Sequence, residues 1–135
     1  MKRILVMDDD AQFRQVLRLI LEEAGYGVFD AKDGQKGMRL LQTEPIDLVI
    51  TDILMPGKEG IETITELQQD YPDVKIIAVS GGGRISGENY LRTAKLIGAD
   101  RTFTKPFKRD ELLGAMQELL AASTPTLIPK AAGDA

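Results

Sequence analysis

Short runs of apolar residues alternate with longer amphipathic stretches along this sequence. The apolar runs cover residues 4–7, 26–29, 46–50, 74–79 and 102–103, of which the second and the fifth are the weakest. The other three are nearly free of polar residues, which is typical of central parallel strands that are buried on both faces. The pattern therefore predicts five strands.

Amphipathic stretches follow these runs. Apolar residues recur at helical spacing from Phe13 to Leu21, and Gly25 follows as a candidate C-terminal cap residue. The same spacing returns in residues 37–41, 61–67, 90–97 and 112–120. Five strand–helix repeats favour right-handed crossovers and a parallel sheet with helices on both faces. Five strands are too few for an eight-stranded barrel, so we expect an α/β fold with an open, doubly wound sheet.

The end of the sequence differs from the rest. Residues 123–135 contain Pro125 and Pro129 and have no periodic apolar face. We therefore expect one domain over residues 1–122, followed by a flexible C-terminal tail or linker stub at 123–135.

Composition removes several kinds of chemistry. The 135 residues include no Cys and no His, which excludes disulfides, thiolate or His-ligated metal sites, His-dependent triads and a phosphohistidine on this chain. The net charge is −4, so the chain lacks the overall positive charge that is typical of nucleic-acid-binding proteins. No apolar run approaches the ~18 residues of a membrane span or forms a signal-peptide core. We expect a cytoplasmic protein with no membrane insertion and no direct nucleic-acid partner.

Polar residues follow four of the five apolar runs. Asp8, Asp9 and Asp10 come after the first run, Asp52 ends the third, Ser80 ends the fourth, and Lys105 follows the fifth. In a doubly wound sheet, ligands bind outside the carboxyl ends of the strands. We therefore expect these side chains to meet at one edge of the sheet.

Most of these residues also have ordinary structural explanations. Asp10 is placed to cap the helix that follows, the glycines after Ser80 suit a turn, and Lys105 alone suits a solvated surface. Asp52 precedes no evident helix. Carboxylates gathered at one edge repel one another unless a cation relieves them, and Mg²⁺ suits such a set. A hydroxyl and an ammonium then suit phosphoryl oxygens, and a carboxylate is an established nucleophile toward phosphorus.

Four segments, ILVMDDD, LVITDILMPGKEG, IIAVS and TKPF, resemble in this order the receiver domain of two-component response regulators. The resemblance covers about residues 2–122. It implies a flavodoxin-like sheet with strand order 2-1-3-4-5. It also implies that Asp52 is the phosphoacceptor, that Ser80 and Lys105 contact the phosphoryl group, and that a cis peptide precedes Pro106.

The resemblance implies a Mg²⁺ site as well. Asp9 would bind the ion directly and Asp8 would act through water. The remaining protein ligands would be the side chain of Asp52 and the backbone carbonyl of Leu54.

These implications describe a stand-alone switch and not an enzyme. A sensor histidine kinase, a phosphotransfer protein or a small phosphodonor would supply the phosphoryl group, because the chain has no His of its own. A downstream protein would bind the surface of the fourth helix, fifth strand and fifth helix, where Arg92 and Lys95 are candidate contacts. A homodimer is left open.

The sequence departs from the family pattern at two places. Thr102 stands where the family often has an aromatic switch residue, and strand alternation directs Phe103 to the opposite face, into the core. The segment after Ser80 is unusually rich in glycine. We therefore expect phosphorylation to order residues 81–90.

Three alternatives remain beside this interpretation. The chain could be the receiver of a longer regulator with an output domain. It could be a Mg²⁺-dependent phosphohydrolase with an aspartate nucleophile, although residues 53–56 offer no second acid–base carboxylate. It could also be a receiver that acts without phosphate.

Overall fold

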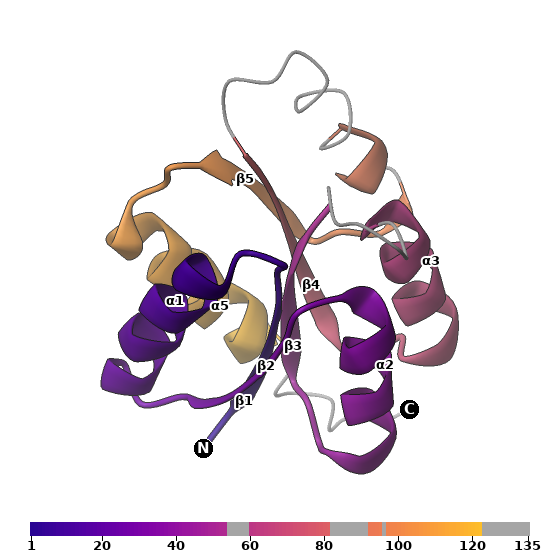
Figure 1. Ribbon diagram of the computed structural model, residues 1–135, viewed down its shortest axis with the longest axis horizontal. Coiled ribbons are helices and arrows are strands. Elements are labelled where there is room, and N and C mark those ends of the chain that lie inside the picture. Colours follow the sequence, from indigo (N-terminus) through magenta and orange to yellow (C-terminus); the bar gives the residue numbers. More distant parts are fainter. Residues whose placement is uncertain (54–59, 82–91, 96, 123–135) are drawn as a thin grey trace.

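The computed structural model describes residues 1–53, 60–81, 92–95 and 97–122 of the chain (Figure 1). The strands are β1 (Arg3–Met7), β2 (Gly27–Ala31), β3 (Leu48–Asp52), β4 (Lys75–Gly81) and β5 (Arg101–Lys105). The helices labelled in Figure 1 are α1 (Ala11–Glu23), α2 (Gly34–Thr43), α3 (Gly60–Asp70) and α5 (Arg109–Ala122). Residues 92–95 are also helical.

The five strands form one parallel sheet in the order β2-β1-β3-β4-β5. Both the doubly wound fold and the strand order implied by the resemblance are confirmed. Because β1 and β3 are neighbours, Met7 pairs with Thr51 at the carboxyl end of the sheet. Between β4 and β5, Ser80 lies opposite Thr104 and Gly81 opposite Lys105. The topology thus brings residues from four separate sequence segments to one edge.

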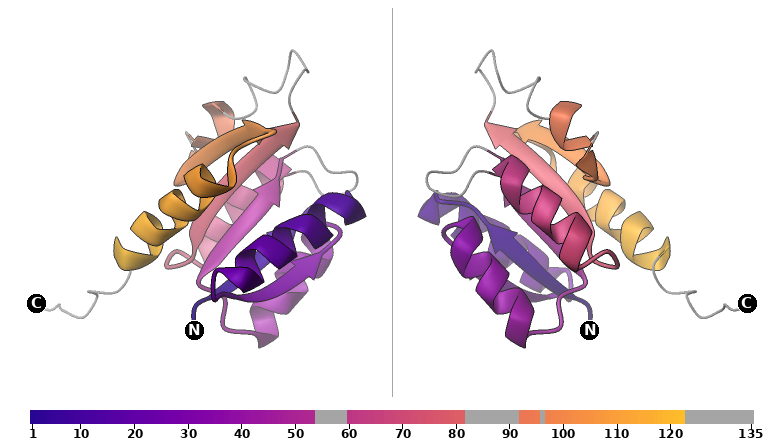
Figure 2. Two further views of the ribbon diagram at one scale, coloured as in Figure 1. Left: turned by 90° about the vertical axis from the view of Figure 1, so that its left-hand side faces the viewer. Right: turned by 90° about the vertical axis from the view of Figure 1, so that its right-hand side faces the viewer.

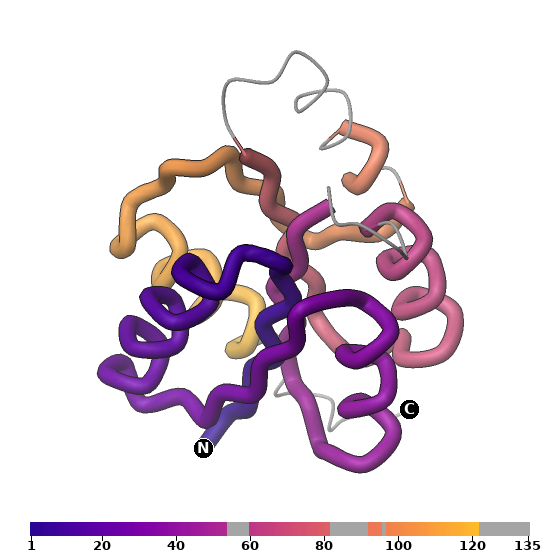
Figure 3. The backbone as a smooth tube through the Cα atoms, viewed as in Figure 1, coloured from indigo at the N-terminus to yellow at the C-terminus, as the bar shows by residue number. Residues whose placement is uncertain are grey.

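Helices cover both faces of the sheet (Figures 1 and 2). One core cluster contains side chains from both α1 (Leu17, Leu21) and α5 (Leu112, Met116). These two helices, far apart in the sequence, therefore lie side by side (Figure 3). The second core cluster, which includes Met38, Leu41, Ile64 and Leu67, lies under α2 and α3. This two-sided burial explains why β1, β3 and β4 consist almost entirely of apolar residues.

Two weak apolar runs form strands through their neighbours in the sheet. The strand β2 extends to Ala31, beyond the expected run, because Asp30 and Ala31 pair with Val6 and Met7. The edge strand β5 is only partly buried, which explains its poor apolar signal. The pairing of β5 with β4, whose central residues are buried, nevertheless fixes its register.

The predicted ends of α1 are confirmed. The carboxylate of Asp10 accepts hydrogen bonds from the backbone N–H groups of Gln12 and Phe13, at 3.0 and 3.2 Å. Gly25, directly after the C-cap Ala24, has a φ of 98°, a conformation that favours glycine. Asp10 thus fixes the point at which the chain enters α1 from β1, and Gly25 the point at which it leaves α1 toward β2.

Several predictions concern residues outside the described part of the chain. They include the Leu54 carbonyl, most of the glycine-rich segment after Ser80, and the tail at 123–135. These stay predictions. Among the described residues, no helix has both the length and the hydrophobicity that crossing a bilayer requires.

Candidate functional site

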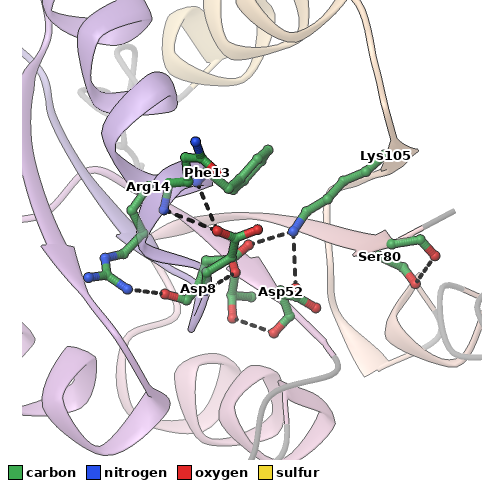
Figure 4. Close-up of polar contacts among 10 residues, drawn as sticks. Asp8, Phe13, Arg14, Asp52, Ser80 and Lys105 are labelled. Carbon is green, nitrogen blue, oxygen red and sulfur yellow. Dashed lines mark hydrogen bonds and ion pairs between the residues drawn. The ribbon is translucent and has the colours of Figure 1, made fainter.

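Three carboxylates gather at the carboxyl edge of the sheet. Figure 4 shows two of them, Asp8 and Asp52. Asp8 directly follows β1, Asp9 comes next, and Asp52 is the last residue of the adjacent strand β3. One oxygen from each of the three carboxylates lies within 4.8 Å of the other two. We call Asp8, Asp9 and Asp52 the acidic cluster. The prediction that strand order would bring these residues together is confirmed.

Asp8 is the most deeply held member, with 1% of its surface exposed. Its Oδ1 accepts a hydrogen bond from the Asp10 backbone N–H at 2.9 Å, and its backbone carbonyl accepts one from Arg14 Nη1 at 2.7 Å. Burial raises the pKa of the Asp8 carboxyl, and the charge of Asp52 adds to this effect. The hydrogen bonds from Lys105 and the Asp10 backbone act in the opposite direction.

Lys105, at the end of β5, bridges two members of the acidic cluster. Its Nζ donates to Asp8 Oδ2 at 2.7 Å and to Asp52 Oδ2 at 3.2 Å. The same Nζ lies 3.9 Å from the centroid of the Phe13 ring, a cation–π contact. Burial alone lowers the pKa of the Lys105 ammonium, but its hydrogen bonds and the charges of the two carboxylates outweigh burial and raise it. The ammonium therefore stays charged and partly neutralises the cluster.

Gly60 allows the first residue of α3 to pack against the backbone of Asp52 and Ile53. A Cβ atom at this position would lie 2.2 Å from Ile53 Cα and 2.7 Å from the Asp52 carbonyl oxygen. No side chain fits at these distances, because both neighbours are backbone atoms. Glycine at the first residue of α3 thus sets how closely this helix approaches the end of β3.

Ser80 lies on β4 next to β5 and is fully buried. Its hydroxyl donates a hydrogen bond to the Gly81 carbonyl at 3.5 Å (Figure 4). Because Gly81 pairs with Lys105, Ser80 and the bridging lysine lie at the same edge of the sheet. The peptide between Lys105 and Pro106 is cis, as the resemblance implies.

Thr102 and Phe103, which are neighbours on β5, have different surroundings. Phe103 packs against the core cluster under α1 and α5, with its ring centroid 5.4 Å from that of Phe107. This confirms the core position expected from strand alternation. Thr102 pairs with Ala78 and is partly buried, and it has no ring to swing between two positions.

The acidic cluster fits a hard divalent cation. Mg²⁺ binds oxygen at about 2.0–2.1 Å, so two oxygens on one ion lie at most about 4.2 Å apart. The oxygens of the cluster, within 4.8 Å of one another, need only small side-chain adjustments to meet this limit. Burial and the charge of Asp52 both raise the pKa of Asp8, so a bound cation would favour the charged form of this carboxylate.

Sequence reasoning did not find two contacts that hold this site. These are the hydrogen bond from Arg14 to the Asp8 carbonyl and the contact between Lys105 and Phe13. Both contacts involve α1, which begins three residues after Asp8. An arginine and an aromatic residue on an amphipathic helix carry no local signal for them, because only the tertiary packing of α1 creates the contacts.

Fold and site together define a class: a small doubly wound domain whose sheet carries an acidic, lysine-bridged cluster at its carboxyl edge. The sequence matches the response regulator receiver domain over residues 4–117, and the chain belongs to this family. Receiver domains of two-component systems are in general signalling switches and not enzymes.

Curated relatives support this assignment. The chain is 37% identical to the response regulator MprA of Mycolicibacterium vanbaalenii over 124 residues, which cover 91% of the chain and 52% of MprA. It is 34% identical over 126 residues to the receiver protein CpdR of Brucella abortus, covering 91% of the chain and 100% of CpdR. The chain therefore spans about half of MprA and all of CpdR.

Solved receiver structures share the fold. A CheY-like receiver from Methanospirillum hungatei has a TM-score of 0.82 and 30% identity, covering 93% of this chain and 98% of that one. The Thermotoga maritima response regulator TrrA, solved in complex with Mg²⁺-BeF, has a TM-score of 0.78 and 34% identity, covering 88% of this chain and 99% of that one.

Proposed function

We propose that this protein is a phosphorylation-controlled switch in which Asp52 accepts a phosphoryl group from a partner's phosphohistidine. The observation that carries the proposal is the lysine bridge. Lys105 Nζ lies 2.7 Å from Asp8 and 3.2 Å from Asp52, at an edge where Asp9 completes the acidic cluster. Such a bridge supplies positive charge beside the carboxylate that would react.

In the proposed transfer, one carboxylate oxygen of Asp52 forms a bond to phosphorus as the P–N bond of the donor breaks. The donor imidazole keeps the electron pair of that bond. Lys105 would turn from Asp52 toward a phosphoryl oxygen, and the hydroxyl of Ser80 would leave the Gly81 carbonyl to donate to another. Both groups act by offsetting charge on the transferring group.

Three side chains, Asp8, Asp9 and Asp52, would hold Mg²⁺, together with the backbone carbonyl of Leu54. When bound, the ion supplies positive charge to the phosphoryl oxygens. The Asp10 backbone N–H holds Asp8 Oδ1, and Arg14 holds the Asp8 backbone carbonyl. The carboxylate of Asp8 is therefore oriented before any ion binds. The Mg²⁺-BeF complex of TrrA supports this assignment by similarity.

The transfer test uses a phosphorylated sensor-kinase transmitter domain as the donor, with Mg²⁺ present. We expect wild-type protein to take up one phosphoryl group and Asp52→Asn to take up none. The matched control is Asp47→Asn, which removes a carboxylate just before the opposite end of the same strand, where Asp47 binds the Arg3 backbone N–H at 2.8 Å. Undiminished uptake by Asp52→Asn contradicts the proposal.

A phosphohydrolase is the alternative from a different class. Such an enzyme needs a second carboxylate, a few residues after its nucleophile in the sequence, to act as acid and base. Here Asp52 instead pairs with Lys105. Incubation with a generic phosphate ester distinguishes the two: a switch releases at most one equivalent of product per chain, whereas a hydrolase turns over continuously.

We propose that a downstream protein reads the surface formed by the helical residues 92–95, β5 and α5. Arg92 and Lys95 are exposed there, and Arg101 on β5 forms an ion pair with Glu118 on α5. Reversing the charge of Arg92 should weaken the complex with the phosphorylated protein and leave phosphorylation unchanged. Equal binding by this variant would place the partner elsewhere.

The full-length match to CpdR supports a receiver that acts without an attached output domain. The half-length match to MprA and to the transcriptional regulatory protein CpxR of Escherichia coli, which is covered over 51% of its length, supports the alternative of a longer regulator. Either arrangement uses the same site.

A further inference from the structure

A hollow of about 600 Å³ lies beside the acidic cluster, between α1, the end of β2 and α2. Four positively charged side chains line it, and we call them the basic hollow: Arg14, Lys32, Lys36 and Arg39. In a chain with a net charge of −4, this is a marked concentration of positive charge.

Little in the described part of the chain balances this charge. Asp30 is the one carboxylate among the described lining residues, and it is paired with Arg18 on α1 at 3.2 Å. No ion pair of Lys32, Lys36 or Arg39 is present among the described residues. Among the described lining residues, the basic hollow therefore has four cations and one carboxylate, and that carboxylate already pairs with Arg18.

The arrangement is unfavourable for the fold itself. Lys36 and Arg39 lie one turn apart on α2, where like charges repel. Lys36 also lies in the first turn of α2, where the N-cap carboxylate of Asp33 offsets only part of the positive end of the helix dipole. A negatively charged ligand would relieve both effects.

Arg14 provides a second, independent observation. Its Nη1 donates to the Asp8 carbonyl at 2.7 Å, but its Nε is buried and has no hydrogen-bond partner. A buried donor without a partner is costly, and this one belongs to a residue that lines the hollow (Figure 4 shows the side chain). A ligand oxygen that reached this donor would remove that cost.

We infer that the basic hollow binds a small molecule that carries a di- or triphosphate group. Four cations exceed what one phosphate needs, and a hollow of this size falls within the usual ~300–1,000 Å³ of small-molecule sites. Ala31 and Leu40 add apolar surface for a nucleoside or similar group. The inference does not depend on phosphorylation of Asp52.

The test is calorimetric titration of the full chain with sodium tripolyphosphate and, separately, with ATP. The buffer is free of divalent metal, so that the acidic cluster takes no part. We expect saturable one-to-one binding of both probes. If neither binds, or if ATP binds and tripolyphosphate does not, phosphate recognition by the basic hollow is refuted.

The variant Lys36→Gln/Arg39→Gln should weaken tripolyphosphate binding about 100-fold, at about tenfold for each charge-assisted hydrogen bond lost. The matched control, Arg3→Gln/Lys108→Gln, removes the same charge from exposed positions elsewhere and should leave the affinity within about twofold. Equal weakening by both pairs would mean that binding follows net charge alone and would overturn the inference.

Amide NMR on the unmutated protein provides a test that does not require the variants to fold. Tripolyphosphate should shift the resonances of Arg14 and of residues 30–43 most strongly. Shifts centred on residues 92–109, or spread evenly over the surface, would contradict the site.

Discussion

The acidic cluster gathers negative charges and the basic hollow gathers positive charges, and one residue, Arg14, connects the two. Arg14 lines the basic hollow and donates a hydrogen bond to the backbone of Asp8 in the acidic cluster. The acidic cluster has an internal counter-ion, Lys105, bound to two of its three carboxylates. Among the described residues that line the basic hollow, the one carboxylate is Asp30, and it already pairs with Arg18. The fold therefore balances one cluster internally, whereas the other depends on a ligand.

This difference determines what each cluster can exchange. At the acidic cluster, an incoming cation or phosphoryl group competes with or redirects an ammonium that is already in place. At the basic hollow, an incoming anion breaks no ion pair of Lys32, Lys36 or Arg39 among the described residues. We therefore expect substitutions at the acidic cluster to have large effects on both stability and chemistry, and substitutions at the basic hollow to have smaller effects on stability.

The largest effect is expected from Lys105→Ala. Removing the bridge leaves the buried Asp8 without its counter-ion, which should lower the free energy of unfolding of the metal-free protein by about 3 kcal/mol. Phosphoryl uptake should fall about 100-fold, because a donor aimed at the transferring group is lost. Chemical denaturation and transfer kinetics measure the two effects.

Metal affinity serves as the internal control for this variant. Since Lys105 is not a proposed ligand, Lys105→Ala should still bind Mg²⁺. Loss of the ion together with loss of uptake would mean that the lysine acts only by holding the cluster together.

The next largest effect concerns Asp9. Saturating Mg²⁺ should stabilise the wild-type protein by about 2–3 kcal/mol, as expected for a ligand at 100 times its dissociation constant. Asp9→Asn should lose most of this gain, whereas Asp10→Asn, a change in the helix cap next to it, should keep it. Thermal melting with and without the ion distinguishes the two variants, and equal gains in both would remove Asp9 from the metal site.

Alkaline pH should weaken the bridge itself. The pKa of Lys105 is raised above its ordinary value of 10.5 in the folded state, so its stabilisation is fully present below pH 10.5 and is lost as pH rises through the raised value. Burial also raises the pKa of Tyr26, so the relevant quantity is the difference in stability between wild type and Lys105→Gln. That difference should shrink above pH 10.5, and a constant difference would contradict the bridge.

The smallest effect is expected at the basic hollow, and it has the opposite sign. Lys36→Glu removes a like charge from beside Arg39 and places a negative charge in the first turn of α2. The free energy of unfolding should rise by about 0.5 kcal/mol while binding of tripolyphosphate is lost. Reduced stability in this variant, measured by urea denaturation, would show that the hollow is balanced internally after all.

The fold was predictable because burial on both faces leaves a clear signal. The runs that became β1, β3 and β4 contain little except apolar residues, and the caps Asp10 and Gly25 follow local chemistry. The end of β2 was not predictable from its own residues. Asp30 belongs to the strand because it pairs with Val6, which is a property of the sheet.

The candidate site was predictable in its residue types and in its location. Carboxylates and a lysine at strand ends had to meet once the strand order was set, and here that order came from the family resemblance. The contacts of Arg14 and Phe13 with the site were not predictable, because they depend on how α1 packs over the end of β1. The basic hollow has the same origin, since Arg14 is 18 residues or more from its other cationic members in the sequence.

The most direct test of the central claim locates the phosphoryl group on the unmutated protein. Transfer from the phosphorylated kinase domain is followed by borohydride reduction, which converts an aspartyl phosphate to homoserine, and peptide mass spectrometry then identifies the altered residue. The account predicts homoserine at position 52, with Asp8 and Asp9 unchanged. Homoserine at position 8 or 9, or a stable phosphate on a hydroxyl such as Ser80, would contradict it.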